Sequence, residues 1–122
     1  MNITQLRKEC KFWQGRLGLQ QWKISVNWSK PTDHPQAYGS NDFDPNHMVS
    51  SIMILHPKYH VNLAIDKTDL PIQTLVHELL HLSLFPLEAA AGFATKVPDE
   101  HWELAAEQFI NILSSALLKE TP

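Results

Sequence analysis

The spacing of apolar residues along the chain predicts one N-terminal helix followed by two or three strands. From residue 3 to residue 17, apolar side chains recur every three or four positions with charged residues between them, which is typical of an amphipathic helix. Residues 21–28 alternate between apolar and polar, as in a strand with one buried face. Residues 51–55 are more uniformly apolar and predict a more deeply buried strand. A short strand at residues 37–43 is expected between these two.

The second half of the chain has the pattern of two further helices. Apolar residues cover most of the circumference of a helix from Leu70 to about Phe85, so this helix is expected to be buried. Asp69 can cap its start, and Pro86 is expected to end it. After a connector, the last helix runs from about residue 100 to residue 118. Its expected core stripe is Trp102, Ala105, Ala106, Phe109, Leu113, Ala116 and Leu117.

This order of elements predicts an α+β fold in which helices pack on one face of a small three-stranded sheet. The 122 residues fit a single domain, residues 1–122, and are enough to bury a core. The formal net charge of −3 and the absence of a basic run argue against a nucleic-acid-binding protein. The pattern indicates no particular oligomeric state.

The N-terminal segment and the cysteine content predict the cellular compartment. The first eleven residues carry four charges and no apolar stretch of the kind that a signal peptide needs. No apolar run reaches transmembrane length. Cys10 is the single cysteine, so an internal disulfide is impossible and no oxidising compartment is required. We therefore expect a cytoplasmic protein without a membrane partner.

The leucine-rich helix is interrupted by the motif His77-Glu78-Leu79-Leu80-His81. Four residues separate the two histidines, so their imidazoles lie one turn apart on one helix face and can bind one metal ion. Glu78 lies about 100° round the helix, from where its carboxylate can reach a metal-activated water without ligating the metal. The alternative is a coincidental match with ordinary hydrogen-bonded core histidines. Burying three ionisable groups is costly unless they are paired or ligated, which favours a zinc site.

A third protein ligand is expected from the last helix. The long metzincin motif is excluded, because leucines stand where it requires a glycine and a third histidine. Glu103 and Glu107 share one face of the last helix, and the small Ala106 beside them permits a close approach to the histidine helix. We predict Glu103 as the third ligand, with His101 as the next choice. Glu107 is then expected to accept a hydrogen bond from a ligand imidazole, or else to be a solvated helix glutamate.

With these residues identified, the chain resembles the gluzincins, zinc peptidases that combine an HExxH motif with a downstream glutamate. It is similar in particular to the very small, phage- and prophage-associated members called minigluzincins. The resemblance lies in the motif at 77–81 with Thr-Leu-Val before it, and in the segment Glu-x-x-Ala-Glu-x-Phe at 103–109. That segment resembles the glutamate helix of peptidases that cleave repressors of mobile elements. The segment at 17–24 is similar to the entry to the first strand in such domains.

The resemblance implies a zincin-like minimal domain with His77, His81 and Glu103 as zinc ligands and Glu78 as the catalytic base. Thermolysin-like gluzincins place an aspartate four residues after the ligand glutamate, and this chain has Glu107 there. The extra domains that build a deep substrate cleft in larger relatives are also missing. A narrow substrate range, a propeptide-like role or a cleft completed by a partner is therefore expected.

The predicted function is that of a zinc-dependent metallopeptidase acting on peptide or protein substrates. Water activated by Zn²⁺ is expected to lose a proton to Glu78 and attack the peptide carbonyl. An exposed strand edge at residues 51–55 is expected to hold the substrate in extended form. The alternative function is a zinc-binding regulatory or interaction module with little turnover, and hydrolysis of a non-peptide amide is a third. Glu78 favours an enzyme, because a purely structural zinc site has no use for a carboxylate beside a metal-bound water. Structural sites usually close with four protein ligands and leave no position for that water.

Overall fold

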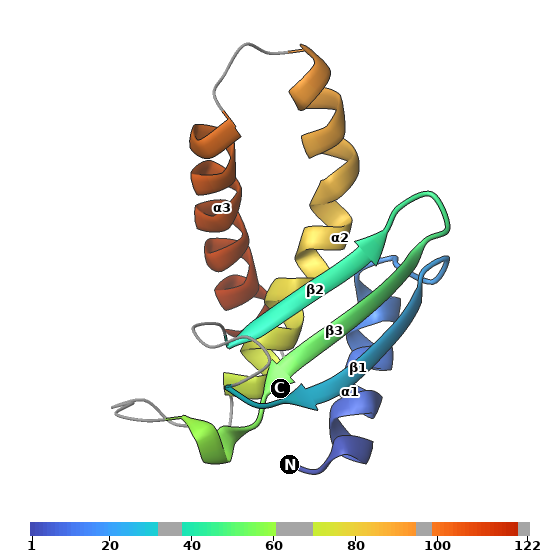
Figure 1. Cartoon of the computed structure of the whole chain (residues 1–122), viewed down its shortest axis with the longest axis vertical. Helices are drawn as coiled ribbons and strands as arrows, with labels where there is room; N and C mark the ends of the chain where they lie inside the picture. The colour runs from blue at the N-terminus through green and yellow to red at the C-terminus, as the bar shows by residue number, and fades with distance from the viewer. Residues whose placement is uncertain (32–37, 61–69, 95–98, 120–122) are drawn as a thin grey trace.

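The computed structural model describes residues 1–31, 38–60, 70–94 and 99–119, except for the side chains of 91–94 and 99–102. The described residues form three α-helices and one three-stranded sheet, which confirms the expected α+β class (Figure 1). The elements in chain order are α1 (Ile3–Arg16), β1 (Lys23–Ser29), β2 (Gly39–Asp44), β3 (Val49–Leu55), a 3-10 turn (Pro57–Tyr59), α2 (Leu70–Ala94) and α3 (Asp99–Lys119).

The sheet has the strand order β1-β3-β2, with β3 in the centre. β1 pairs with β3 in parallel, and β2 pairs with β3 in the antiparallel sense. Because both edges of β3 are paired, the prediction that residues 51–55 offer an open edge to a substrate is wrong. Uniform hydrophobicity in this strand reflects its central position. The sheet edges are formed by β1 and β2.

α1 and α2 pack against one face of the sheet, α3 packs against α2, and the core lies between the helices and the sheet (Figure 1). α1 contacts β1, α2 contacts β2 and β3, and α2 is flanked by α1 and α3. Alternate residues of β3 point into this layer, so Ser50, Ile52 and Ile54 are buried. Burial of each large apolar side chain contributes about 1.5–3 kcal/mol. The fully buried large side chains include Leu6, Trp13, Ile52, Ile54, Leu75, Leu79, Leu82 and Ile110.

α2 continues through Pro86 to Ala94, so the predicted helix end at Phe85 is wrong. A proline inside a helix removes one backbone hydrogen bond and costs about 3 kcal/mol. Here the proline is exposed, and the alanines at 89–91 that follow have the highest helix propensity of any residue. The nine residues from Pro86 to Ala94 lengthen the helix by roughly 13 Å at 1.5 Å per residue.

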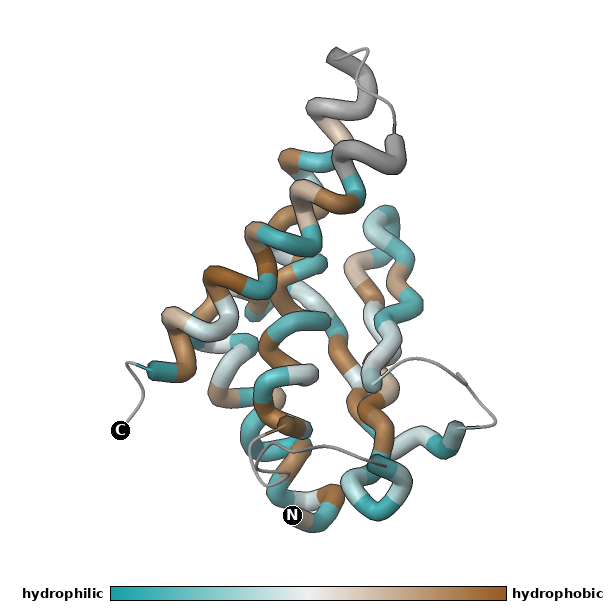
Figure 2. Tube along the Cα trace, turned by 90° about the vertical axis from the view of Figure 1, so that its left-hand side faces the viewer, coloured by the Kyte–Doolittle hydropathy of each residue, from teal (hydrophilic) through white to brown (hydrophobic). Residues whose placement is uncertain are grey.

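The buried face of α3 is rotated from the predicted stripe. Ala106, Ile110 and Ser114 are buried, whereas Phe109 is 53% exposed. Apolar residues lie on two sides of this helix, so the sequence pattern alone did not decide between them. Figure 2 shows apolar and polar residues mixed along the helices. None of the helices in the described ranges is long and apolar enough to cross a membrane.

Candidate metal centre

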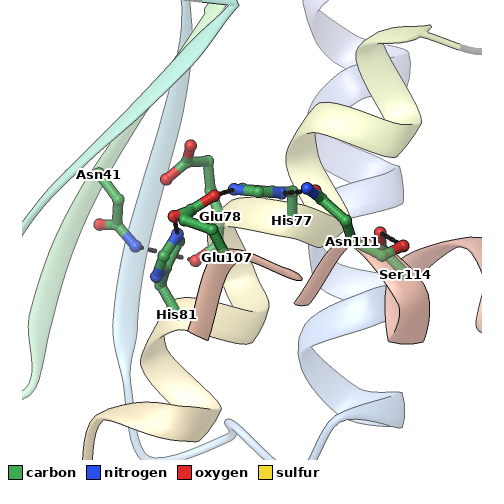
Figure 3. A network of polar contacts seen from close by, with 7 residues as sticks. All are labelled: Asn41, His77, Glu78, His81, Glu107, Asn111 and Ser114. Carbon is green, nitrogen blue, oxygen red and sulfur yellow. Dashed lines mark hydrogen bonds and ion pairs between the residues drawn. The ribbon is translucent and has the colours of Figure 1, made fainter. Parts of the chain in front are cut away.

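His77 and His81 project from the same side of α2, one turn apart (Figure 3). Their ring centroids are 5.0 Å apart, and each side chain is about a quarter exposed. Buried leucines and a valine on the other sides of the helix hold it against the core, which fixes the direction in which the two imidazoles point. The two predicted histidines therefore lie together, and their imidazoles are partly exposed to solvent.

Glu107 of α3 lies between the two imidazoles (Figure 3). One carboxylate oxygen, Oε2, lies 3.1 Å from Nε2 of His77, and the other, Oε1, lies 2.8 Å from Nε2 of His81. In the described part of the chain, these three residues form a group in which one potential ligand atom from each lies within 4.8 Å of the others. The packing of α2 against α3 thus brings His77 and His81 of one helix into contact with Glu107 of the other.

The structure brings Glu107, and not the predicted ligand Glu103, into this group. Its contacts with both imidazoles also fit the expectation that Glu107 accepts a hydrogen bond from a ligand histidine. Glu103 is exposed and lies one turn before Glu107 on α3. Helical phase cannot choose between residues one turn apart, because both share a face. The choice depends on how α3 is placed along α2, which the phase of α3 alone does not give. The side chain of His101, the other predicted choice, lies outside the described residues.

Asn111 completes the surroundings of His77. Its Oδ1 lies 3.0 Å from Nδ1 of His77, on the ring side opposite to Glu107. With Oδ1 as the acceptor, Nδ1 carries the hydrogen, and in the neutral imidazole Nε2 then presents its lone pair to the group. Asn111 is absent from the predicted site residues. The four-residue spacing from Glu107 to Asn111, which places both on one helix face, is the sequence signal that points to it.

The chemistry of this group fits a divalent metal such as zinc. Two imidazole nitrogens and a carboxylate form an established zinc ligand set, and ligands 2.0–2.2 Å from a tetrahedral ion are roughly 3.4 Å apart. The observed separations of 3.1 and 2.8 Å are close to that spacing. In addition, Nε2 of His77 faces a carboxylate oxygen of Glu107. This arrangement is repulsive unless a proton or a metal cation lies between the two atoms.

Glu78 lies beside the group but is buried, with 8% of its surface exposed. Burial, together with the negative charge of Glu107, raises the pKa of Glu78 to about 7. The backbone of β2 lies against it: a Cβ placed on Gly39 would lie 3.3 Å from Oε1 of Glu78 and 2.4 Å from Cγ2 of Thr74. Only a residue without a side chain fits there, so Gly39 allows β2 to lie directly against Glu78.

Asn41 links the sheet to α2 next to the same residue. Its Nδ2 donates to the backbone carbonyl of Glu78 at 3.0 Å (Figure 3). Its Oδ1 accepts from the hydroxyl of Ser50 at 2.6 Å. Ser50 is buried in β3, so this chain of hydrogen bonds runs from the central strand through the edge strand to the helix. It fixes the distance between β2 and Glu78. Neither Gly39 nor Asn41 is among the predicted site residues.

The polar residues after β3 do not join the group. His60 is buried, and its Nε2 lies 3.3 Å from the carbonyl oxygen of Leu55. Its ring packs against Tyr38 at a centroid distance of 5.2 Å. Tyr59 is part of the 3-10 turn, where Lys58 lies over its ring. Asp69, the predicted cap of α2, lies outside the described residues.

Known proteins add nothing to this geometry: no family model matches the chain, and neither a curated protein nor a solved structure matches it.

Proposed function

We propose that this protein is a zinc-dependent hydrolase of peptide bonds, with His77, His81 and Glu107 as the metal ligands and Glu78 as the general base. The observation that carries the proposal is the group of three potential ligand atoms, contributed by two helices, with a buried carboxylate beside it. A zinc ion held there supplies Lewis-acid chemistry, polarising a carbonyl and making water acidic near neutral pH.

The role proposed for Glu78 is proton transfer. It is the neighbour of His77 in the chain but does not belong to the ligand group, so its oxygens are free to take a proton from water and return it to the leaving amine. Its contact with Gly39 and the anchoring of its backbone by Asn41 hold it in one place. A general base has to be positioned in this way before substrate arrives, because positioning lowers the entropic part of the barrier.

The strand that we propose for substrate alignment is β2. It is an edge strand, and it is the strand that contacts Glu78. An extended peptide that adds to such an edge gains main-chain hydrogen bonds, and its scissile bond then runs past the residues next to the strand. In this proposal β2 holds the extended substrate, the role that the sequence analysis expected of residues 51–55.

The rival function, a zinc-binding regulatory module, is less well supported. A structural zinc site takes four protein ligands, whereas the described residues bring three together. A buried carboxylate next to such a site would carry a desolvation cost without a use. An enzyme uses both features: a metal position that no protein ligand fills can take water or substrate, and the carboxylate can transfer a proton.

The test compares the wild type with Glu78→Gln on a peptide library analysed by mass spectrometry. Gln keeps the shape of the side chain and loses its basicity, so both proteins should bind equal amounts of zinc. We expect cleavage by the wild type only, with a loss of roughly 10²–10⁴-fold in the variant. Equal cleavage by the two would identify a contaminating protease or another base. Zinc binding without any cleavage by the wild type would favour the regulatory module.

A further inference from the structure

A second surface of interest is the cleft between α1 and the edge strand β1. It has a volume of about 300 Å³ and lies between residues 7–14 of α1 and residues 24–27 of β1. It shares no residue with the group around His77 and Glu107. Two cationic side chains of α1, Arg7 and Lys11, line it together with the buried Cys10.

The backbone of β1 faces this cleft with hydrogen-bonding groups. Among the described residues, β1 pairs with β3 alone, so its other edge is open. The N–H of Lys23 donates towards β3, to the carbonyl of Met48 at 2.8 Å. Because backbone groups alternate along a strand, those of Ile24 and Val26 point to the open edge. Both residues line the cleft.

α1 contacts this edge at both ends and leaves the backbone groups between those contacts unoccupied by it. Nε2 of Gln14 donates to the carbonyl of Trp22 at 2.7 Å, which occupies the first outward-facing group. At the other end, Nη2 of Arg7 donates to Oδ1 of Asn27 at 2.9 Å. The seven residues from Arg7 to Gln14 span about 10 Å of helix at 1.5 Å per residue. That length matches about three residues of an extended chain at roughly 3.3 Å each.

The charge of this region differs from that of the rest of the chain. Six of the ten basic residues, but one of the thirteen acidic residues, lie in residues 1–30. A guanidinium has five N–H donors, so Arg7 keeps donors for a ligand while it contacts Asn27. The local positive charge selects an acidic partner. It also disfavours pairing of β1 with β1 of a second copy, which would bring like charges together.

From these features we infer that the open edge of β1 binds an acidic, extended segment of a partner protein by strand addition. Arg7 and Lys11 are one helical turn apart, about 6 Å along the axis. Alternate side chains of an extended segment are roughly 6.6 Å apart on the same face. The segment that fits therefore carries two acidic residues separated by one residue, with its backbone paired to Ile24 and Val26.

The experiment is a selection of random heptapeptides, displayed on phage, against the full chain. We expect enrichment of peptides with Asp or Glu at alternate positions, and loss of that enrichment with the double variant Arg7→Glu, Lys11→Glu. The matched control is Lys8→Glu, Lys119→Glu, which changes the net charge equally at exposed positions outside the cleft. For the best peptide, the cleft variant should weaken binding by about tenfold or more, and the control by much less.

A second variant tests the strand pairing. Ile24→Pro removes the outward N–H and leaves the ladder to β3 in place, and proline is tolerated on an edge strand. With an unchanged circular dichroism spectrum, it should weaken peptide binding, and in the wild type the amide NMR signals of Ile24 and Val26 should shift on titration. The inference is overturned by enrichment without alternating acids, by equal enrichment on the cleft variant, by an absence of enrichment, or by an oligonucleotide that displaces the peptide from the cleft.

Discussion

Oδ1 of Asn111 lies 3.0 Å from Nδ1 of His77, and Asn111 follows Glu107 by one helical turn on α3. This contact orients the imidazole so that Nε2 points at the ligand group. One face of α3 thus provides both a potential metal ligand and the residue that orients another potential ligand. Two consequences of this arrangement can be measured on the same helix.

Replacing Asn111 by Leu should weaken zinc binding by about 10–100-fold, the range typical for partners that orient metal ligands. Leu has a similar volume but cannot accept a hydrogen bond from His77. Asn111→Asp should retain tight binding, since a carboxylate accepts the same bond. Competition against a chromophoric chelator gives the affinities. Equal affinities for the Leu and Asp variants would show that Asn111 only fills space.

Glu107→Ala should lower zinc affinity by more than about 100-fold, beyond the effect of an orienting partner. Glu103→Ala is the matched control, because it removes the same side chain from the same helix one turn away and should leave affinity unchanged. The chelator competition ranks the two variants. A larger loss in Glu103→Ala would restore the ligand that the sequence favours over the one indicated by the geometry.

Gly39→Ala should destabilise the fold by about 1–3 kcal/mol, as overpacking usually does, and should impair catalysis. The added Cβ would lie 2.4 Å from Cγ2 of Thr74. That methyl group cannot turn away freely, because Oγ1 of Thr74 donates to the carbonyl of Leu70 at 2.9 Å. β2 must therefore move away from Glu78.

Thr74→Ser removes the obstructing methyl group and keeps the hydroxyl. The double variant Gly39→Ala, Thr74→Ser should therefore recover most of the stability lost by Gly39→Ala, as measured by urea unfolding. Additive losses in the double variant would mean that the close approach of β2 to Thr74 is not what requires a glycine.

The thiol of Cys10 predicts a pH dependence of stability. Burial raises its pKa to about 11 from an ordinary value of 9.0. The neutral thiol stabilises the folded state fully below pH 9, and this contribution is lost as the pH rises from about 9 to about 11, where the unfolded chain releases its proton first. The loss should be about 1–3 kcal/mol at roughly 1.4 kcal/mol per pKa unit.

Urea unfolding of the wild type and of Cys10→Ala at pH 8 and at pH 10.5 measures this contribution. Cys10→Ala removes only the thiol, so the two proteins share the titration of every other group. The wild type should lose more stability than the variant between the two pH values. Parallel losses would show that the thiol titrates normally.

The elements of this fold follow from local patterns, whereas the site depends on distances between elements. The alternation in residues 21–28 and the four-residue spacing of His77 and His81 are local, so the strand and the histidine pair were predictable. The choice between Glu103 and Glu107 depends on how α3 is placed along α2, which the periodicity of α3 does not measure. The length of α2 is hidden from periodicity too, because it balances the cost of Pro86 against the helix propensity of the alanines after it.

The positions of Gly39 and Asn41 were unpredictable for a related reason. Both matter because β2 pairs with β3 at the edge that lies over Glu78, and strand order is a property of the whole sheet. A glycine within a weakly patterned segment signals a close approach of backbones, but it does not name the partner. The contacts with Thr74 and Glu78 appear only once helix and sheet are packed.

The most direct test of the metal centre is anomalous diffraction at the zinc absorption edge, from crystals of the full chain grown with zinc. We predict one anomalous peak per chain, about 2.0–2.2 Å from Nε2 of His77, Nε2 of His81 and a carboxylate oxygen of Glu107. A fourth position should hold no protein atom. The absence of a peak between these residues, or a peak closed by four protein ligands, would contradict the proposed catalytic centre.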